Sequence, residues 1–72
     1  MNGYDEEIPW PENMPKDLQK SAKRLDIYNK NPKLEVYFCL EQEHMEALAK
    51  MAEIEEKITE NELDVILTKI GL

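Results

Sequence analysis

The stretch that decides the fold runs from Asn31 to Ile58 and reads NPKLEVYFCLEQEHMEALAKMAEIEEKI. Its apolar residues recur at alternating steps of three and four, which places them on one side of a helix with 3.6 residues per turn. Glutamate and lysine occupy most of the remainder, so the pattern predicts one long amphipathic helix whose apolar seam needs a partner surface. The seam consists of Tyr37, Leu40, His44, Ala47, Met51, Ile54 and Ile58.

The first part of this stretch has an alternative interpretation. From Leu34 to Leu40 every second residue is apolar, an alternation that is typical of a half-buried strand. A strand would need a pairing partner, such as the proline-broken N-terminal segment or the edge of a second copy. Asn31 followed by Pro32 is a good helix start, as N-cap and first residue, and favours the helix.

Two shorter helices flank the long one. Pro15 is well placed in a first turn and predicts a helix to about Asn29. Thr59 and Glu62 match the S/T-x-x-E capping box, which predicts a last helix from Glu60 to Ile70. The expected apolar faces are Leu18, Ala22, Leu25 and Tyr28 in the first of these helices, and Leu63, Ile66, Leu67 and Ile70 in the last.

Residues 1–14 are predicted to form an extended acidic arm, and residues 15–72 a single helical domain. Pro9 and Pro11 fix their own φ and bias the residues before them toward extended conformations. Trp10, between them, is either a lid over a small core or an exposed anchor for another protein, since a buried Trp often dominates interface energy. The expected fold class is all-α, with two to three helices and an extended N-terminal arm.

Charge is distributed unevenly along this chain of 72 residues. Residues 1–13 carry a net charge of −4, residues 14–33 carry +4 and residues 34–72 carry −7. Binding to nucleic acid needs a concentrated basic face, so we expect no direct nucleic-acid contact. No apolar run approaches the roughly 20 residues that span a bilayer, and a single cysteine fits a reducing compartment. We therefore expect a cytoplasmic protein without membrane contact.

Few residues offer catalytic or metal chemistry. Glu41 and His44 have the Glu-x-x-His spacing of carboxylate-bridged di-metal bundles, and a homodimer would supply two such pairs. Phosphate-binding glycine loops, Cys-x-x-Cys pairs and nucleophile motifs are absent from the sequence. We expect no enzyme activity and no cofactor. Cys39 lies in an apolar run and is expected to behave as a small buried hydrophobe.

The segment Ile8-Pro9-Trp10-Pro11-Glu12-Asn13-Met14-Pro15 resembles the opening of short accessory proteins from bacterial prophages and conjugative elements. This resemblance implies an origin in a mobile element. It covers these positions alone and implies no site or activity.

We expect a non-enzymatic protein–protein interaction module. So small a chain has a thin core, and self-association would stabilise its folded state. The expected partner is a protein, including a second copy that forms a homodimer through the seam. The predicted contact residues are Trp10, Tyr37, Leu40, His44, Met51 and Ile54.

Two further hypotheses remain open at this point. In one, the acidic helices imitate nucleic acid and occupy the binding channel of a host DNA- or RNA-binding protein, with Glu53, Glu55 and Glu56 in contact. In the other, a dimer binds metal through Glu41 and His44.

Overall fold

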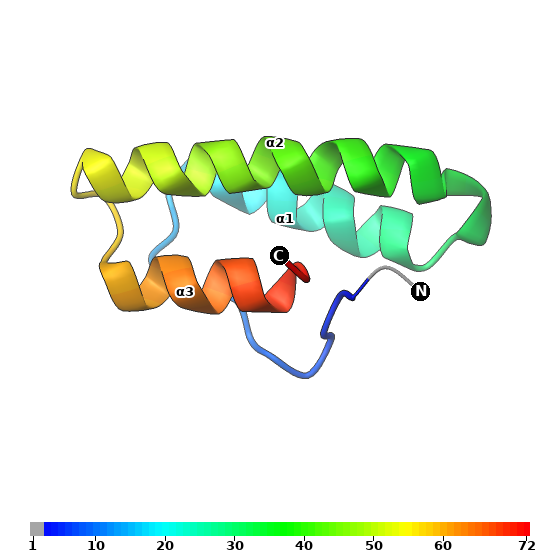
Figure 1. Cartoon of the computed structure of the whole chain (residues 1–72), viewed down its shortest axis with the longest axis horizontal. Helices are drawn as coiled ribbons and strands as arrows, with labels where there is room; N and C mark the ends of the chain where they lie inside the picture. Colours follow the sequence, from blue (N-terminus) through cyan, green and yellow to red (C-terminus); the bar gives the residue numbers. More distant parts are fainter. Residues whose placement is uncertain (1–2) are drawn as a thin grey trace.

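The computed structural model describes residues 3–72 and consists of three α-helices around one core. These are α1 (Lys16–Asn29), α2 (Glu35–Ile54) and α3 (Glu60–Lys69), and a 3-10 turn (Pro32–Leu34) joins the first two. Figure 1 shows α2 along the whole length of the molecule, with α1 behind it and α3 below it. The molecule measures 35 × 20 × 18 Å. The predicted all-α class is confirmed.

The long helix is shorter at both ends than the sequence predicts. Asn31 is an N-cap, as expected, but the cap belongs to the 3-10 turn, where its side chain accepts a hydrogen bond from the Lys33 amide at 3.0 Å. No residue between 3 and 72 lies in a strand, so the strand interpretation of Leu34 to Leu40 is wrong. The proline-broken arm does not pair with this segment, and the backbone instead satisfies its hydrogen bonds within the helix.

The end of α2 is set by backbone hydrogen bonds that curl back over the last turn. The Glu56 amide donates to the Glu53 carbonyl at 3.0 Å, and the Lys57 amide donates to the Ala52 carbonyl at 2.8 Å. This is the Schellman pattern, which requires a left-handed residue, and Glu56 supplies it with φ of 62°. Ile58 therefore lies beyond the helix and is buried in the core from the connecting turn.

Both ends of α3 follow the sequence signals. Thr59 accepts from the Glu62 amide at 3.1 Å while the Glu62 side chain accepts from the Thr59 amide at 2.8 Å, so the predicted capping box is confirmed. Gly71 adopts φ of 84°, and the Leu72 amide donates to the Leu67 carbonyl at 2.9 Å. The chain thus closes with the expected left-handed glycine.

The core lies on one side of α2, between that helix, α1 and α3. The predicted faces of α1 and α3 point into it, with Leu18, Leu25, Ile66 and Ile70 fully buried. From α2 the core receives Phe38, Met45, Ala49 and Ala52, and Met14 and Ile58 complete it from the connecting segments.

Within the described residues, 3–15 form no helix and pack back onto the helices, while residues 1 and 2 of the predicted arm lie outside the described part of the chain. Tyr4 touches all three: its ring meets Phe38 of α2 edge-on at 5.6 Å, its hydroxyl donates to Asp26 of α1, and the Lys69 ammonium of α3 lies 4.8 Å from its ring centre. The Asp5 amide donates to the Lys69 carbonyl at 2.8 Å. The arm therefore closes the fold between α1 and α3.

Candidate protein-binding face

Six of the seven predicted seam residues lie on the surface of the protein, whereas Ile58 is buried in the core. Tyr37, Leu40, Met51 and Ile54 are 56%, 59%, 54% and 72% exposed, and His44 and Ala47 are exposed with them. We call these six residues the outer face of α2. The sequence predicts that the seam packs against a partner surface, and no described part of the chain covers these six residues.

A second apolar set on the same helix packs against α1 and α3 instead. Phe38, Met45, Ala49 and Ala52 are the buried residues of α2, and we call them the inner face. Taking 100° per residue, the centres of the two faces are about 140° apart around the helix. The helix is thus apolar on two nearly opposite sides, and its own fold covers one of them.

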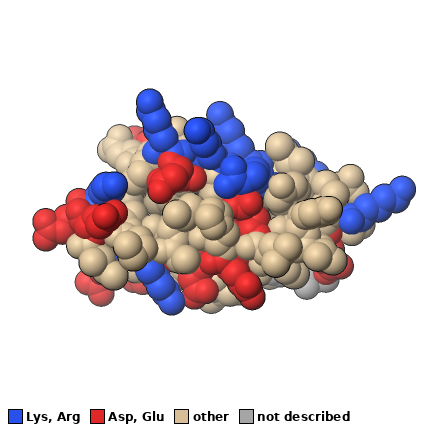
Figure 2. Space-filling view, turned by 90° about the horizontal axis from the view of Figure 1, so that it is seen from above, with Lys and Arg blue, Asp and Glu red and all other residues tan. Residues whose placement is uncertain are grey.

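Charged groups border the outer face. Glu43 and Lys50 follow its edge one heptad apart, and Lys50 forms an ion pair with Glu46 at 3.1 Å. Seen from the α2 side in Figure 2, mainly uncharged surface extends along the molecule between a row of basic side chains and groups of acidic ones. An apolar band with a polar border is the usual anatomy of a protein-binding surface.

The outer face is continuous with an aromatic contact between the helices. Tyr37 lies against Tyr28 of α1, with ring centres 5.9 Å apart. Val36 is 70% exposed beside it, a residue that the heptad pattern did not include. Cys39 is exposed as well, so its expected burial as a small hydrophobe is wrong. It projects away from the inner face, where Phe38 occupies the core position.

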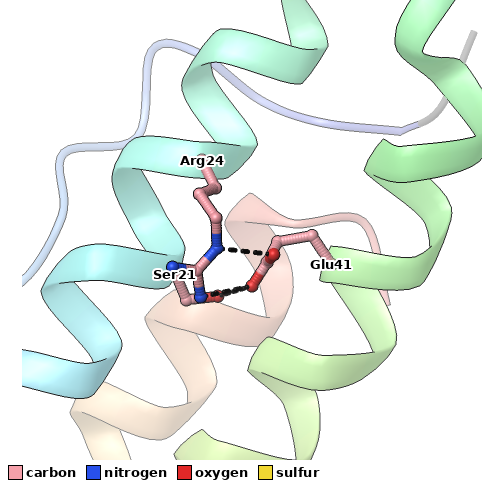
Figure 3. A network of polar contacts seen from close by, with 3 residues as sticks. All are labelled: Ser21, Arg24 and Glu41. Atoms are coloured by element: carbon pink, nitrogen blue, oxygen red, sulfur yellow. Dashed lines mark hydrogen bonds and ion pairs between the residues drawn. The ribbon is translucent and has the colours of Figure 1, made fainter.

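Glu41 is held by α1 and is not turned toward a metal site. Arg24 donates to its two carboxylate oxygens at 2.7 and 3.1 Å, and the buried Ser21 hydroxyl donates at 2.6 Å. Figure 3 shows how the three side chains converge between α1 and α2. Burial raises the pKa of Glu41, but the hydrogen bonds from Arg24 and Ser21 outweigh it and hold that pKa below its usual range.

The metal hypothesis joined Glu41 to His44, which lies on the outer face. Within residues 3–72 no group of three or more His, Cys, Asp or Glu side chains is arranged to hold a metal ion. The described residues of one chain therefore provide no set of ligands for a metal ion.

Trp10 lies half-buried against the core in the position of a lid. Its ring centre is 4.9 Å from the Lys69 ammonium, and its indole N–H points to Asp26 at 3.5 Å. The opposite edge of the arm borders a shallow apolar hollow lined by Pro9, Trp10, Pro11, Glu12, Asn61, Glu62 and Val65. The structure thus gives Trp10 a role in packing and leaves its role as an anchor a prediction.

Lys69 holds the N-terminal arm through contacts with Tyr4, Asp5, Ile8 and Trp10, which we call the arm cluster. The sequence analysis did not identify Lys69 as part of a site. The side chain is 3% exposed, and its ammonium donates to the carbonyls of Asp5 at 3.1 Å and Ile8 at 2.6 Å. The faces of Tyr4 and Trp10 complete its surroundings by cation–π contact. At the end of a helix a lysine is expected merely to favour the dipole, so nothing local in the sequence signalled this burial.

The predicted acidic contact residues lie together where α2 ends. Glu55 and Glu56 are exposed and Glu53 is half-buried, and Lys57 pairs with Glu55 at 3.5 Å. The lysine interrupts the negative surface at this point. Nucleic-acid mimicry stays a prediction, since none of these contacts favours it over an ordinary solvated surface.

Comparisons of this chain with protein-family models, with curated proteins and with solved structures gave no match. Among residues 3–72 no helix combines the length and apolar character that crossing a membrane requires.

Proposed function

We propose that this chain is a non-enzymatic protein–protein interaction module and that the outer face of α2 is its binding surface. The observation that carries the proposal is the exposure of Leu40, Met51 and Ile54 on a helix whose inner face is already packed. Apolar residues at heptad spacing along a well-formed helix match the way amphipathic helices bind one another.

Binding at the outer face requires little rearrangement of the chain. The face belongs to a helix of 20 residues that α1 and α3 hold in place, so few groups need to be ordered on contact. Its side chains do not contribute to the core and are available to a partner. The free thiol of Cys39 supports a reducing compartment such as the cytoplasm. The resemblance of Ile8 to Pro15 supports an origin in a mobile element.

Site-specific photo-crosslinking tests the proposal whatever the identity of the partner. A photoreactive phenylalanine analogue replaces Leu40 in one variant and the exposed Asp64 of α3 in a matched control, and both are irradiated in cells that express the chain. We expect a discrete covalent adduct from position 40 and none from position 64. The adduct should disappear when Met51→Lys and Ile54→Lys are added, while the circular dichroism of the purified protein stays unchanged.

Absence of any adduct at position 40, from a chain that is folded and abundant, would refute the proposal. So would an adduct that persists after both lysine substitutions, because charge placed on two of the four large apolar residues should remove an apolar contact.

A further inference from the structure

We propose that the occupant of the outer face is a second copy of this chain, and that the two α2 helices pair antiparallel with Leu40 of each opposite Met51 of the other. This inference rests on the proposed function and adds the partner and its register. In this register Tyr37 lies opposite Ile54 of the partner copy, and His44 lies opposite Ala47.

The spacing of the outer face favours another helix with the same repeat. From Tyr37 to Ile54 the face keeps alternating steps of three and four, without interruption, over about 25 Å of helix. This repeat is the knobs-into-holes pattern by which two helices bury a shared seam. A second copy supplies a face of identical length and spacing.

The sizes of the side chains select the antiparallel orientation. In a parallel pair each residue would meet its own copy, so that Ala47 would face Ala47 and leave a gap, while His44 would face His44. In the antiparallel pair the small Ala47 meets the larger His44, so no layer is formed by two alanines and the layers are filled more evenly than in the parallel pair. Even filling of layers is what well-packed helix pairs require.

The charges beside the face are complementary in the same register. Glu43 and Lys50 lie on the same edge, and an antiparallel pair brings Glu43 of each copy beside Lys50 of the other, twice by symmetry. Lys50 pairs with Glu46 of its own chain, but its side chain is 55% exposed and remains open to a second carboxylate. A parallel pair would bring Lys50 beside Glu55 and leave Glu43 beside Leu48, without a cation. The antiparallel pair therefore matches both charged residues of this edge.

The net charge of −7 on each copy opposes association. Most of this repulsion acts between charges that lie farther apart than the side chains in contact at the seam. Exposed charges more than a Debye length apart, about 8 Å at physiological salt, are largely screened. We expect a dimer that persists or strengthens as salt increases, because apolar contacts carry it.

Sedimentation equilibrium tests the occupant, at protein concentrations up to about 1 mM so that weak association is seen. We expect a reversible dimer. Glu43→Lys alone and Lys50→Glu alone should each weaken it about tenfold, because two attractive pairs become repulsive. The double variant should return to within about threefold of the parent. Glu12→Lys makes the same charge change on the arm and should leave the dimer unchanged.

Distance measurement between spin labels tests the register. The label is placed at position 36, where the valine is exposed, in a Val36→Cys chain that also carries Cys39→Ser. In the antiparallel pair the two labelled positions are about 28 Å apart along the helix axis, whereas a parallel pair sets them level. A short distance, or failure of the charge swap to restore association, would overturn the register but leave the proposed function standing.

A monomer throughout the concentration range would overturn the second copy as occupant. The photo-crosslinking experiment then separates the two claims: an adduct at position 40 with a foreign protein keeps the proposed function, and no adduct removes both.

Discussion

Replacing Lys69 by methionine tests whether a single buried ammonium holds the N-terminal arm on the helices. Methionine keeps an unbranched apolar stem of similar length, so the change removes the charge and its donors with little loss of volume. The ammonium donates to the carbonyls of Asp5 and Ile8 and lies over the rings of Tyr4 and Trp10.

The magnitude follows from opposing contributions. Two hydrogen bonds from a charged donor contribute about 1.5–3 kcal/mol each, and each cation–π contact adds about 0.5–2 kcal/mol. Removing the ammonium from water costs several kcal/mol, which offsets much of this. The balance leaves the wild type more stable by about 2 kcal/mol, so Tm should fall by about 8–16 °C in a domain of this size.

Thermal and chemical unfolding followed by circular dichroism measure the loss, and the fluorescence of Trp10, the single tryptophan, reports the arm. We expect a red shift in Trp10 emission in Lys69→Met under conditions where the helices remain folded. Lys57→Met removes an exposed lysine and should change the free energy of unfolding by less than about 0.5 kcal/mol. If Lys69→Met matched that control in stability and left Trp10 emission unchanged, the ammonium would not be what anchors the arm.

Three further predictions concern stability. Because the folded pKa of Glu41 lies below its unfolded value, the carboxylate contributes stability at neutral pH that is lost as pH falls through the carboxyl range. Denaturant titrations at several pH values should show that Glu41→Gln lowers the free energy of unfolding by about 1–2 kcal/mol near pH 7 and by less in acid. Glu56→Gly should raise the free energy of unfolding by about 0.5–1 kcal/mol, since glycine adopts the left-handed conformation without strain; an equal or lower value would contradict that account. Burial and the hydrogen bond to Asp26 raise the pKa of Tyr4, so its contribution is complete below about pH 10 and is lost above it; alkaline unfolding should be less steep in Tyr4→Phe.

Local signals in the sequence predicted the elements of this fold well. The capping box at Thr59 and Glu62, the glycine after α3 and the Asn31-Pro32 start involve hydrogen bonds between neighbours in the chain, so their geometry follows from short spacings. The end of α2 at Ile54 was missed because the left-handed residue there is Glu56. A glutamate gives no indication of a Schellman turn.

Spacing alone could not show which face of α2 packs into the core, because the apolar residues of both faces follow heptad spacing. Phe38, Met45, Ala49 and Ala52 also follow heptad spacing, at intervals of seven, four and three, with polar residues at the one step that lies between Phe38 and Met45. The outer face repeats in steps of three and four without a gap from Tyr37 to Ile54, and the prediction followed that repeat. What selects the inner face is close approach: alanines at 49 and 52 leave room for neighbouring helices. That geometry arises only once α1 and α3 are placed.

The contacts of the arm cluster could not be predicted from the sequence at all. Lys69 and its partners Tyr4 and Trp10 are separated by about sixty residues, and no spacing rule links groups so distant in the chain. A tryptophan between two prolines suggested a lid or an anchor, and the lysine that it covers had no visible reason to be buried.

In the proposed dimer, folding and association use different sides of the same helix, so mutations can separate them. Leu40 and Ile54 already lie in water, so exchanging them for polar residues removes little that the fold depends on. Phe38 and Met45 are completely buried, and truncating either leaves a cavity that costs several kcal/mol. A protein whose long helix served its own core alone would gain nothing from large apolar side chains at heptad spacing on the other side. Their presence there is the physical reason to look for a partner helix, and the seam they form is matched in length and charge by a second copy of itself.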